Sequence, residues 1–231
     1  LNKNHINQAS SFFSSLNNSN FKSKYGKEIK NASESCFSIK SHLELTKNKI
    51  SYLVKSINNT IENSEIIDLL NDLNECYKKT EKQIINFSKQ NNIDIDEEIG
   101  SDKRVISPSD FGFHNCIINE SKKLIFFDFE YSGLDDPAKV IGDFFSQLEV
   151  PVPITFFNLF VDKAFANFKN KNEMILRSKL QLPLYKIKWA CIVLNVFLPV
   201  NLERRLFSNP DLDIAEYKLN QLSKAQLIIK I

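Results

Sequence analysis

One short β-hairpin pattern in the middle of the chain constrains the fold more than any other feature of the sequence. Two apolar runs, 116–118 and 124–127, flank the polar stretch 119–122, which is typical of two antiparallel strands joined by a turn. On both sides of this hairpin, apolar residues recur with the spacing of amphipathic helices. The pattern therefore predicts an α+β fold that is mostly α, with a small hairpin inserted between helices.

The helices are predicted from apolar periodicity and from helix-start and helix-stop residues. Asp136 followed by Pro137 is a strong helix start, because Asp caps free N–H groups and Pro suits the first helical turn. Pro151 and Pro153 end that helix. We also expect a short strand at 105–106 and a loop around 25–26. The other expected helices are a short one within the first 31 residues and those at 33–58, 64–90, 154–169, 173–198 and 212–229.

Composition excludes several classes of function. The 231 residues carry a net charge of only +2, which gives no reason to expect nucleic-acid or membrane partners. The four cysteines are widely scattered without a CxxC pair, which disfavours a zinc site. No signal peptide and no apolar run of about 18 residues is present, so we expect a cytoplasmic protein.

Three polar residues border the predicted hairpin. Asp110 and Asn115 lie in the loop before its first strand, and Asp128 follows its second strand. An antiparallel return brings the start of one strand close to the end of the next, so we expect Asn115 and Asp128 to be neighbours in space. Carboxylate and amide oxygens suit Mg²⁺, and a further carboxylate can orient a hydroxyl nucleophile. The spacing therefore predicts a phosphoryl-transfer site rather than three unrelated loop residues.

Two motifs resemble the aminoglycoside phosphotransferase and choline kinase superfamily, whose members are kinase-like small-molecule phosphotransferases. The loop 108–115 is similar to that family's His-Gly-Asp-x-x-x-x-Asn loop, and 127–131 is similar to its metal strand, closest to the choline kinase form. The stretch 135–138, with Asp143 after it, looks like the family's helix start. The resemblance implies the C-terminal lobe of a protein-kinase-like fold, Mg²⁺, ATP as co-substrate, and phosphate transfer to a small-molecule hydroxyl acceptor. A sugar, an amino-alcohol and an aminoglycoside-like acceptor all remain open.

The resemblance also implies roles for single residues. Asp110 would be the catalytic base, or at least the group that aligns the acceptor hydroxyl. Asn115 and Asp128 would be the Mg²⁺ ligands. Glu130 would support the metal or face the substrate, with a strand-end surface acid as the alternative. Asp143 would be a structural acid that holds the catalytic loop in place.

Other residues would shape the site less directly. Trp189 could form a wall of the acceptor pocket, where an aromatic ring favours a sugar face or a quaternary amine, although core packing is the simpler interpretation. Pro108 replaces the His that the family places two residues before its catalytic Asp, so loop rigidity must come from elsewhere. The fixed φ angle of Pro108 can supply part of it. His114 cannot simply replace that missing His, and we group it with Pro108 as support of the loop.

A further departure from the family concerns its β-rich N-terminal lobe, which covers the nucleotide phosphates. No Gly-rich loop between strands and no strand carrying a phosphate-binding Lys precedes residue 100. We therefore expect that lobe to be absent here, and 1–231 to form one helical domain: 1–100 before the catalytic loop, 101–150 with the loop and hairpin, and 151–231 on the acceptor side. As such a C-terminal-lobe fragment, the chain alone would bind nucleotide poorly. The alternative hypothesis is a non-catalytic, pseudokinase-like binding or scaffold module.

Overall fold

The computed structural model describes residues 1–19, 22, 28–58 and 64–229. The loop predicted around Tyr25 and Gly26 lies outside these residues. The chain divides into two compact units, one formed by 1–42 with 95–182 and the other by 43–94 with 183–231. Two compact units of one chain can belong to the same folding domain. The single domain predicted for 1–231 therefore stays a prediction.

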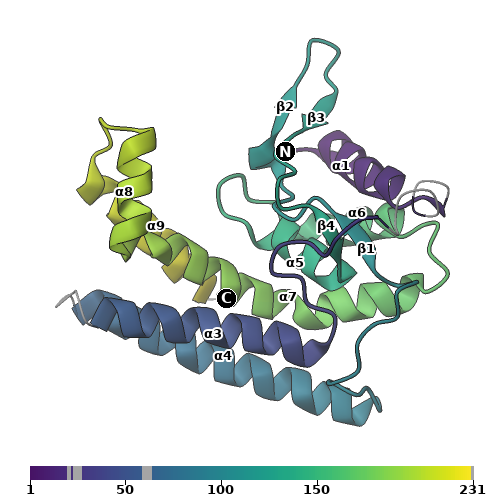
Figure 1. Ribbon diagram of the computed structural model, residues 1–231, viewed down its shortest axis with the longest axis horizontal. Coiled ribbons are helices and arrows are strands. Elements are labelled where there is room, and N and C mark those ends of the chain that lie inside the picture. The colour runs from purple at the N-terminus through teal and green to yellow at the C-terminus, as the bar shows by residue number, and fades with distance from the viewer. Residues whose placement is uncertain (20–21, 23–27, 59–63, 230–231) are drawn as a thin grey trace. The chain divides into compact units, whose positions relative to one another are not determined.

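The first unit holds the predicted hairpin among short helices (Figure 1). The hairpin pairs β2 (Cys116–Ile118) with β3 (Leu124–Phe126), as predicted. A second antiparallel pair joins β1 (Val105–Ser107) to β4 (Gly133–Asp135). The sequence indicates β1 but not β4. The helical elements of this unit include α1 (Lys3–Leu16), η1 (Phe113–Asn115), α5 (Pro137–Ser146), η2 (Ile154–Phe156) and α6 (Phe157–Ala164).

Helix α1 is tied to both strand pairs by two amide side chains. Gln8 donates from Nε2 to the carbonyl of Lys122 (3.2 Å) and accepts from the N–H of Leu124 (2.9 Å). Asn17, at the other end of the helix, exchanges hydrogen bonds with both backbone groups of Ile106 (2.7 and 3.0 Å). These bonds satisfy backbone groups of short strands and fix the hairpin and β1 against one helix.

Beneath the loop and hairpin lies a core rich in phenylalanine. Phe111 stacks near Phe144, with ring centroids 4.9 Å apart, and Phe144 lies 4.4 Å from Phe160. Offset and tilted aromatic pairs of this kind add about 0.5–1.5 kcal/mol each beyond their burial. Because Phe111 directly follows Asp110 in the sequence, its packing in this core anchors the loop that carries Asp110. Its members include Ile6, Phe13, Phe111, Phe113, Phe126, Val140, Ile141, Phe144, Phe145, Phe157, Phe160, Val161 and Phe165.

Helix α5 begins as the sequence predicts. The Oδ1 atom of Asp136 accepts from the N–H of Ala138 (2.7 Å), and Pro137 occupies the first turn. The helix ends at Ser146, before the predicted prolines, and the N–H of Gln147 closes it on the carbonyl of Asp143 (3.0 Å). All residues of α5 are buried, so this helix forms the centre of the first unit.

The predicted start of the next helix at 33 is wrong. Helix α3 (Ile39–Asn58) begins six residues later. Ser38 and Ser41 cap it reciprocally, each accepting from the other's N–H at 3.1 Å. The residues before Ser38 instead run beside β4, where the N–H of Ala32 donates to the carbonyl of Leu134 (2.9 Å). A long-range backbone contact and a strong local cap together override the helical pattern.

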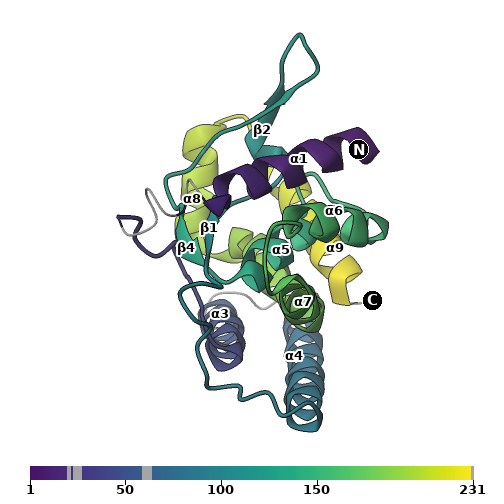
Figure 2. The same ribbon diagram turned by 90° about the vertical axis from the view of Figure 1, so that its right-hand side faces the viewer.

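The second unit is helical. It contains α4 (Ser64–Gln90), η3 (Asn195–Phe197), α8 (Pro199–Ser208), α9 (Ile214–Ile229) and the adjoining parts of α3 and α7 (Lys171–Leu194). Figures 1 and 2 show α3 and α4 running side by side, and the Tyr77 hydroxyl of α4 donates to the carbonyl of Leu43 (3.2 Å). The predicted helix at 173–198 is too long at its end, because α7 gives way to η3, and Pro199 then opens α8, which the sequence did not indicate.

Among the described residues, no single helix is long and apolar enough to cross a bilayer. Residues 171–197 and 199–208 meet that criterion of length and composition only as a bent pair.

Candidate active site

The loop before β2 is held in an unusual backbone conformation. Ser109 has φ of 67°, in the left-handed region that residues with side chains seldom adopt. Its N–H donates to the buried Ser107 hydroxyl (2.9 Å), and the N–H of Asp110 donates to the carbonyl of Pro108 (3.1 Å). Pro108 itself is buried. A residue with a side chain stays in this conformation only where the surrounding structure fixes it, and Ser109 directly precedes Asp110.

The carboxylate of Asp110 is held by two side chains from its own loop. Asn115 donates from Nδ2 to the Asp110 carbonyl (3.0 Å) and to its Oδ2 atom (3.1 Å). Nε2 of His114 lies 3.1 Å from Oδ1. The Asp110 side chain is nevertheless 43% exposed, so an incoming hydroxyl could reach it.

These hydrogen bonds set the protonation state of Asp110. The bond from His114 is the main cause that lowers the pKa of the Asp110 carboxyl below its ordinary value, with a smaller contribution from Asn115. Burial and the negative charge of Asp143 act in the opposite direction. Asp110 is therefore ionised at neutral pH and can accept a hydrogen bond or a proton.

Asn115 and the residue before Asp128 are joined through the backbone. The N–H of Phe127 donates to the carbonyl of Asn115 (3.1 Å), which extends the pairing of Cys116 with Phe126 by one step. Asp128 follows at once, exposed and with φ of 64°. The expected proximity of Asn115 to the end of the second strand is thus confirmed.

The donor atoms at this point fit a magnesium ion. Asn115 uses its Nδ2 group on Asp110, which leaves its Oδ1 atom as a possible ligand, and Asp128 adds an exposed carboxylate. Over the described residues, no group of three or more His, Cys, Asp or Glu side chains could hold a metal by itself. One amide and one carboxylate suit Mg²⁺, which keeps several waters and shares its coordination with substrate phosphates.

A buried ion-pair cluster joins two residues of α5 to the last residue of β4. The Lys139 ammonium is 3.0 Å from Asp135 and 3.3 Å from Asp143, and all three side chains are almost fully buried. Burial raises the pKa of Asp135 to about 6, although Lys139 opposes that change. Burial alone would lower the pKa of Lys139, but Asp143 and Asp135 outweigh it and raise that pKa. Asp143 is thus a buried ion-pair partner of Lys139, and the negative charge of Asp143 also acts to raise the pKa of Asp110.

A second buried cluster was missed by the sequence analysis. Asp136 accepts from Arg177 Nε (2.7 Å) and lies 3.1 Å from Nε2 of His42, with both the His42 and the Asp136 side chains fully buried. Burial lowers the pKa of His42, so the imidazole is neutral and donates to the carboxylate. Burial opposes ionisation of Asp136, but His42 and Arg177 hold its pKa below the ordinary value. The partners lie 94 and 41 positions from Asp136, and no local pattern links them.

Two further residues of the predicted site are Glu130 and Trp189. Glu130 is exposed, in the segment that follows Asp128. Trp189 is half-buried on α7, within the second unit, and its contact with an acceptor stays a prediction.

The hairpin and the segment after it expose large apolar side chains beside Asn115 and Asp128. These are Ile117, Ile118, Ile125, Phe127, Phe129 and Tyr131, all more than two-fifths exposed. Successive residues of a strand point to opposite faces, so Ile117 and Ile118 expose apolar groups on both faces of the hairpin. Apolar periodicity could not reveal this exposure, because the same residues would read as strand core.

Known proteins resemble this chain in fold rather than in sequence. Neither a protein-family profile nor a curated protein sequence matches the chain. Among solved structures, an ethanolamine kinase from Plasmodium vivax is similar over 97% of this chain and 60% of its own, with a TM-score of 0.51 and 15% identity. A choline kinase from Cryptosporidium parvum is similar over 99% of this chain and 65% of its own, with a TM-score of 0.53 and 12% identity.

The coverages, TM-scores and identities of these two matches concern the fold of the chain. The chain spans less than two thirds of the length of either kinase. The mostly helical fold class predicted from the sequence, with its small hairpin, is confirmed. At such low identity the likeness shows a shared fold and leaves the reaction to be argued from the site. The chain shares the mostly helical fold of these two kinases over the part of each that it matches.

Proposed function

We propose that this chain carries the catalytic part of an ATP-dependent phosphotransferase that acts on the hydroxyl group of a small molecule. The observation that carries the proposal is the arrangement of Asp110, Asn115 and Asp128 around one hairpin. Asn115 donates to Asp110 and is bonded through its carbonyl to the residue before Asp128. Such an arrangement separates a carboxylate for the nucleophile from oxygen ligands for a metal.

Asp110 would act on the acceptor. Its ionised carboxylate is reachable from solvent and is held on Oδ1 by His114 and on Oδ2 by Asn115. A hydroxyl donating to this carboxylate would be oriented for attack and could transfer its proton there. The same bonds keep the carboxylate from rotating, which supports positioning as its main contribution.

Asn115 and Asp128 would hold Mg²⁺ through one amide and one carboxylate oxygen. When bound, the ion neutralises negative charge on the nucleotide phosphates. The left-handed backbone at Asp128 turns the chain directly after β3, which fits a side chain placed for a ligand. Lys139 and Asp143 lie buried on α5 behind this loop and would support its position.

The acceptor is proposed from the comparisons. Both similar structures are kinases whose names give an amino-alcohol, ethanolamine or choline. An amino-alcohol is therefore the first acceptor to test, ahead of sugars and aminoglycoside-like compounds.

The test uses the longest natural polypeptide that contains this chain, so that any nucleotide-binding segment is present. Consumption of ATP would be followed with Mg²⁺ and a panel of amino-alcohols and sugars. Asp110→Asn should lower kcat by about 10²- to 10⁴-fold. Glu120→Gln, an exposed acid in the hairpin turn, is the matched control and should leave kcat unchanged. If the natural protein neither consumes ATP nor binds Mg-nucleotide, the proposal is wrong and a binding or scaffold role is favoured.

A further inference from the structure

The residue that ends β1 is of an unexpected kind. Ser107 occupies this position, and its side chain is fully buried. A buried strand position usually holds a β-branched or aromatic residue, because such side chains pack well on a pleated surface. A serine there buries a hydroxyl group, which is unfavourable unless the hydroxyl forms a hydrogen bond. The presence of Ser107 is therefore explained by the bond that its hydroxyl makes.

The partner of this hydroxyl is the backbone N–H of Ser109, at 2.9 Å. Ser109 is itself only 9% exposed, so water cannot readily replace the hydroxyl as the acceptor. The next N–H, that of Asp110, donates to the carbonyl of Pro108 (3.1 Å), and Ser109 between them has φ of 67°. A hydrogen bond across one residue of positive φ forms a γ-turn of the rare and strained type. Two consecutive hydrogen bonds therefore hold this turn directly before Asp110.

The strand that carries Ser107 is fixed along both of its edges. Ser107 pairs with Gly133 of β4. On the other edge, the Asn17 side chain of the α1 cap bonds both backbone groups of Ile106 (2.7 and 3.0 Å). Because the strand is fixed, the Ser107 hydroxyl is an acceptor at a fixed position. It therefore transmits the position of α1 and β1 to the loop that follows.

Little freedom remains between this acceptor and the candidate base. Only Pro108 and Ser109 separate Ser107 from Asp110. The ring of Pro108 fixes the φ angle of that residue. The bonds to the Ser107 hydroxyl and to the Pro108 carbonyl restrain the torsions that follow. The backbone of Asp110 is thus placed by one side chain, that of Ser107, together with the ring next to it.

We propose that the Ser107 hydroxyl holds the γ-turn at Ser109 and thereby positions Asp110, which supplies the rigidity that this loop would otherwise lack without a His at position 108. Ser107 is a positioning residue, because it acts through Asp110 and touches no reactant. Its effect on catalysis rests on the proposed phosphotransferase function, whereas its effect on the turn does not.

Amide hydrogen exchange tests the turn without requiring any activity. In the natural protein, the Ser109 amide should exchange much more slowly than the amide of Ser121, which is exposed in the hairpin turn. Ser107→Ala should speed exchange of the Ser109 amide at least about fivefold, because a buried N–H then loses its acceptor. Ser107→Thr keeps a hydroxyl on a residue that suits strands and should retain slow exchange.

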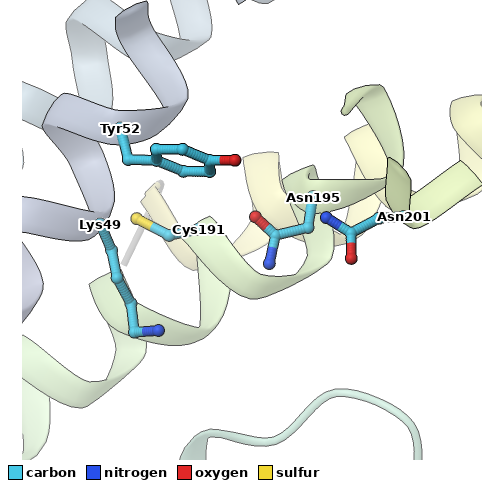
Figure 3. A pocket seen from close by; sticks show the side chains of 5 residues that line it. All are labelled: Lys49, Tyr52, Cys191, Asn195 and Asn201. Carbon is cyan, nitrogen blue, oxygen red and sulfur yellow. The ribbon is translucent and has the colours of Figure 1, made fainter. Parts of the chain in front are cut away.

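Two control variants separate this effect from a general loosening of the fold. Ser178→Ala removes an equally buried hydroxyl of the same unit, which donates within α7 to the carbonyl of Met174 (2.7 Å). Asn195→Ala changes the second unit and lies outside β1 and the Asp110 loop. Both should leave exchange of the Ser109 amide unchanged. Asn195 lines a small pocket (Figure 3) together with Lys49, Tyr52, Cys191 and Asn201.

The kinetic test addresses the effect of Ser107 on Asp110. Ser107→Ala should lower kcat by about 10- to 100-fold with little change in KM, because a misplaced catalytic group weakens interactions made only in the transition state. In the Asp110→Asn background, Ser107→Ala should have no further effect on kcat, since residues that act as a unit are not additive. A merely structural serine would lower the rate equally in both backgrounds.

The two measurements fail independently. An inactive natural protein in which Ser107→Ala still speeds exchange at Ser109 would contradict the proposed function and support the turn. Fast exchange of the Ser109 amide in the natural protein would overturn the proposal, even where Ser107→Ala does not fold. Equal acceleration of exchange in Ser178→Ala, or an equal loss of kcat in the Asp110→Asn background, would overturn it as well.

Discussion

The Nε2 atom of His114 lies 3.1 Å from Oδ1 of Asp110, so the candidate base is held by a side chain four positions later in its own loop. The sequence indicates that Pro108 takes the place of the family's bracing His and that His114 cannot simply replace it. In the structure the Asp110 carboxylate still has an imidazole partner, but this His follows Asp110 in the sequence instead of preceding it. The rigidity of this loop therefore comes from a local pairing and from the buried Pro108.

Loss of the His114 imidazole should impair Asp110 in two ways. His114→Ala should lower kcat about tenfold, equivalent to about 1.4 kcal/mol of barrier. Because the His114 hydrogen bond is the main cause of the lowered pKa of Asp110, that pKa should rise in the variant. The acid limb of the pH–rate profile should then move to higher pH. His114→Gln, which keeps a donor, should restore part of kcat; an unchanged acid limb in His114→Ala would contradict this role.

Gly112 should be required for the position of that imidazole. A Cβ atom at Gly112 would lie 2.5 Å from Nδ1 of His114, so Gly112→Ala must displace the ring. The backbone of Gly112 is extended, and alanine can adopt it, so the effect comes from the contact with His114 and from a 3.2 Å approach of the new Cβ to Cγ of Gln147. We expect Gly112→Ala to reproduce the kinetic defect of His114→Ala with little change in unfolding free energy. At Gly100 the nearest atom is the end of the Asp102 side chain, and Gly100→Ala is the control.

Asp128 should set the metal requirement. Asp128→Asn removes one negative charge from an exposed side chain next to the Asn115 backbone pairing. The Mg²⁺ concentration for half-maximal activity should rise by more than about tenfold, since changes at groups that only support metal ligands already cost that much. A Mg²⁺ titration of the rate measures it. An unchanged Mg²⁺ requirement beside a reduced kcat would assign Asp128 to another role.

Asp136 should be central to the stability of the first unit. Asp136→Ala leaves His42 and Arg177 without their shared carboxylate and removes the cap of α5. Breaking one partner of a buried pair typically costs about 3–5 kcal/mol, and urea denaturation would measure the loss. Asp96→Ala is the comparison, because the Lys40–Asp96 pair is more than half exposed and such pairs contribute about 0–1 kcal/mol. Similar losses of unfolding free energy in the two variants would contradict a central role of Asp136 in stability.

Protonation of His42 should destabilise the fold in mild acid. Burial lowers the pKa of His42 in the folded chain, so below its ordinary value of 6.5 the unfolded chain binds a proton that the folded chain does not. The His42 contribution is present above pH 6.5 and is lost as the pH falls, with a slope of at most about 1.4 kcal/mol per pH unit.

The measurement is the difference in unfolding free energy between the natural protein and His42→Gln from pH 7 to pH 5. Taking the difference cancels Asp135, whose pKa is raised to about 6 and whose contribution therefore has the opposite sign in this range. The natural protein should lose stability relative to the variant as the pH falls. A relative gain would mean that His42 is charged in the folded chain and forms an ion pair with Asp136.

Local features of this fold were predictable, and features that depend on distant residues were not. The hairpin 116–126 and the Asp136 cap follow from residues within a few positions of each other, and both are confirmed. Strand β4 was missed because Gly133, Leu134 and Asp135 carry no strand pattern; they pair only because β1 lies beside them. A Cβ at Gly133 would lie 2.4 Å from the backbone N of Ala32, so glycine permits this close approach.

In the candidate site, too, some features were predictable from the sequence and others were not. The sequence by itself determined that Asp110, Asn115 and Asp128 border one hairpin, because an antiparallel turn of fixed length brings its two ends together. Only the tertiary structure decided what surrounds them: His114 on the Asp110 carboxylate, and Lys139 between Asp135 and Asp143. It also brought Asp136 to His42 and Arg177. Those contacts depend on burial, where an ionised group must find a partner, and a partner at any distance along the chain can serve.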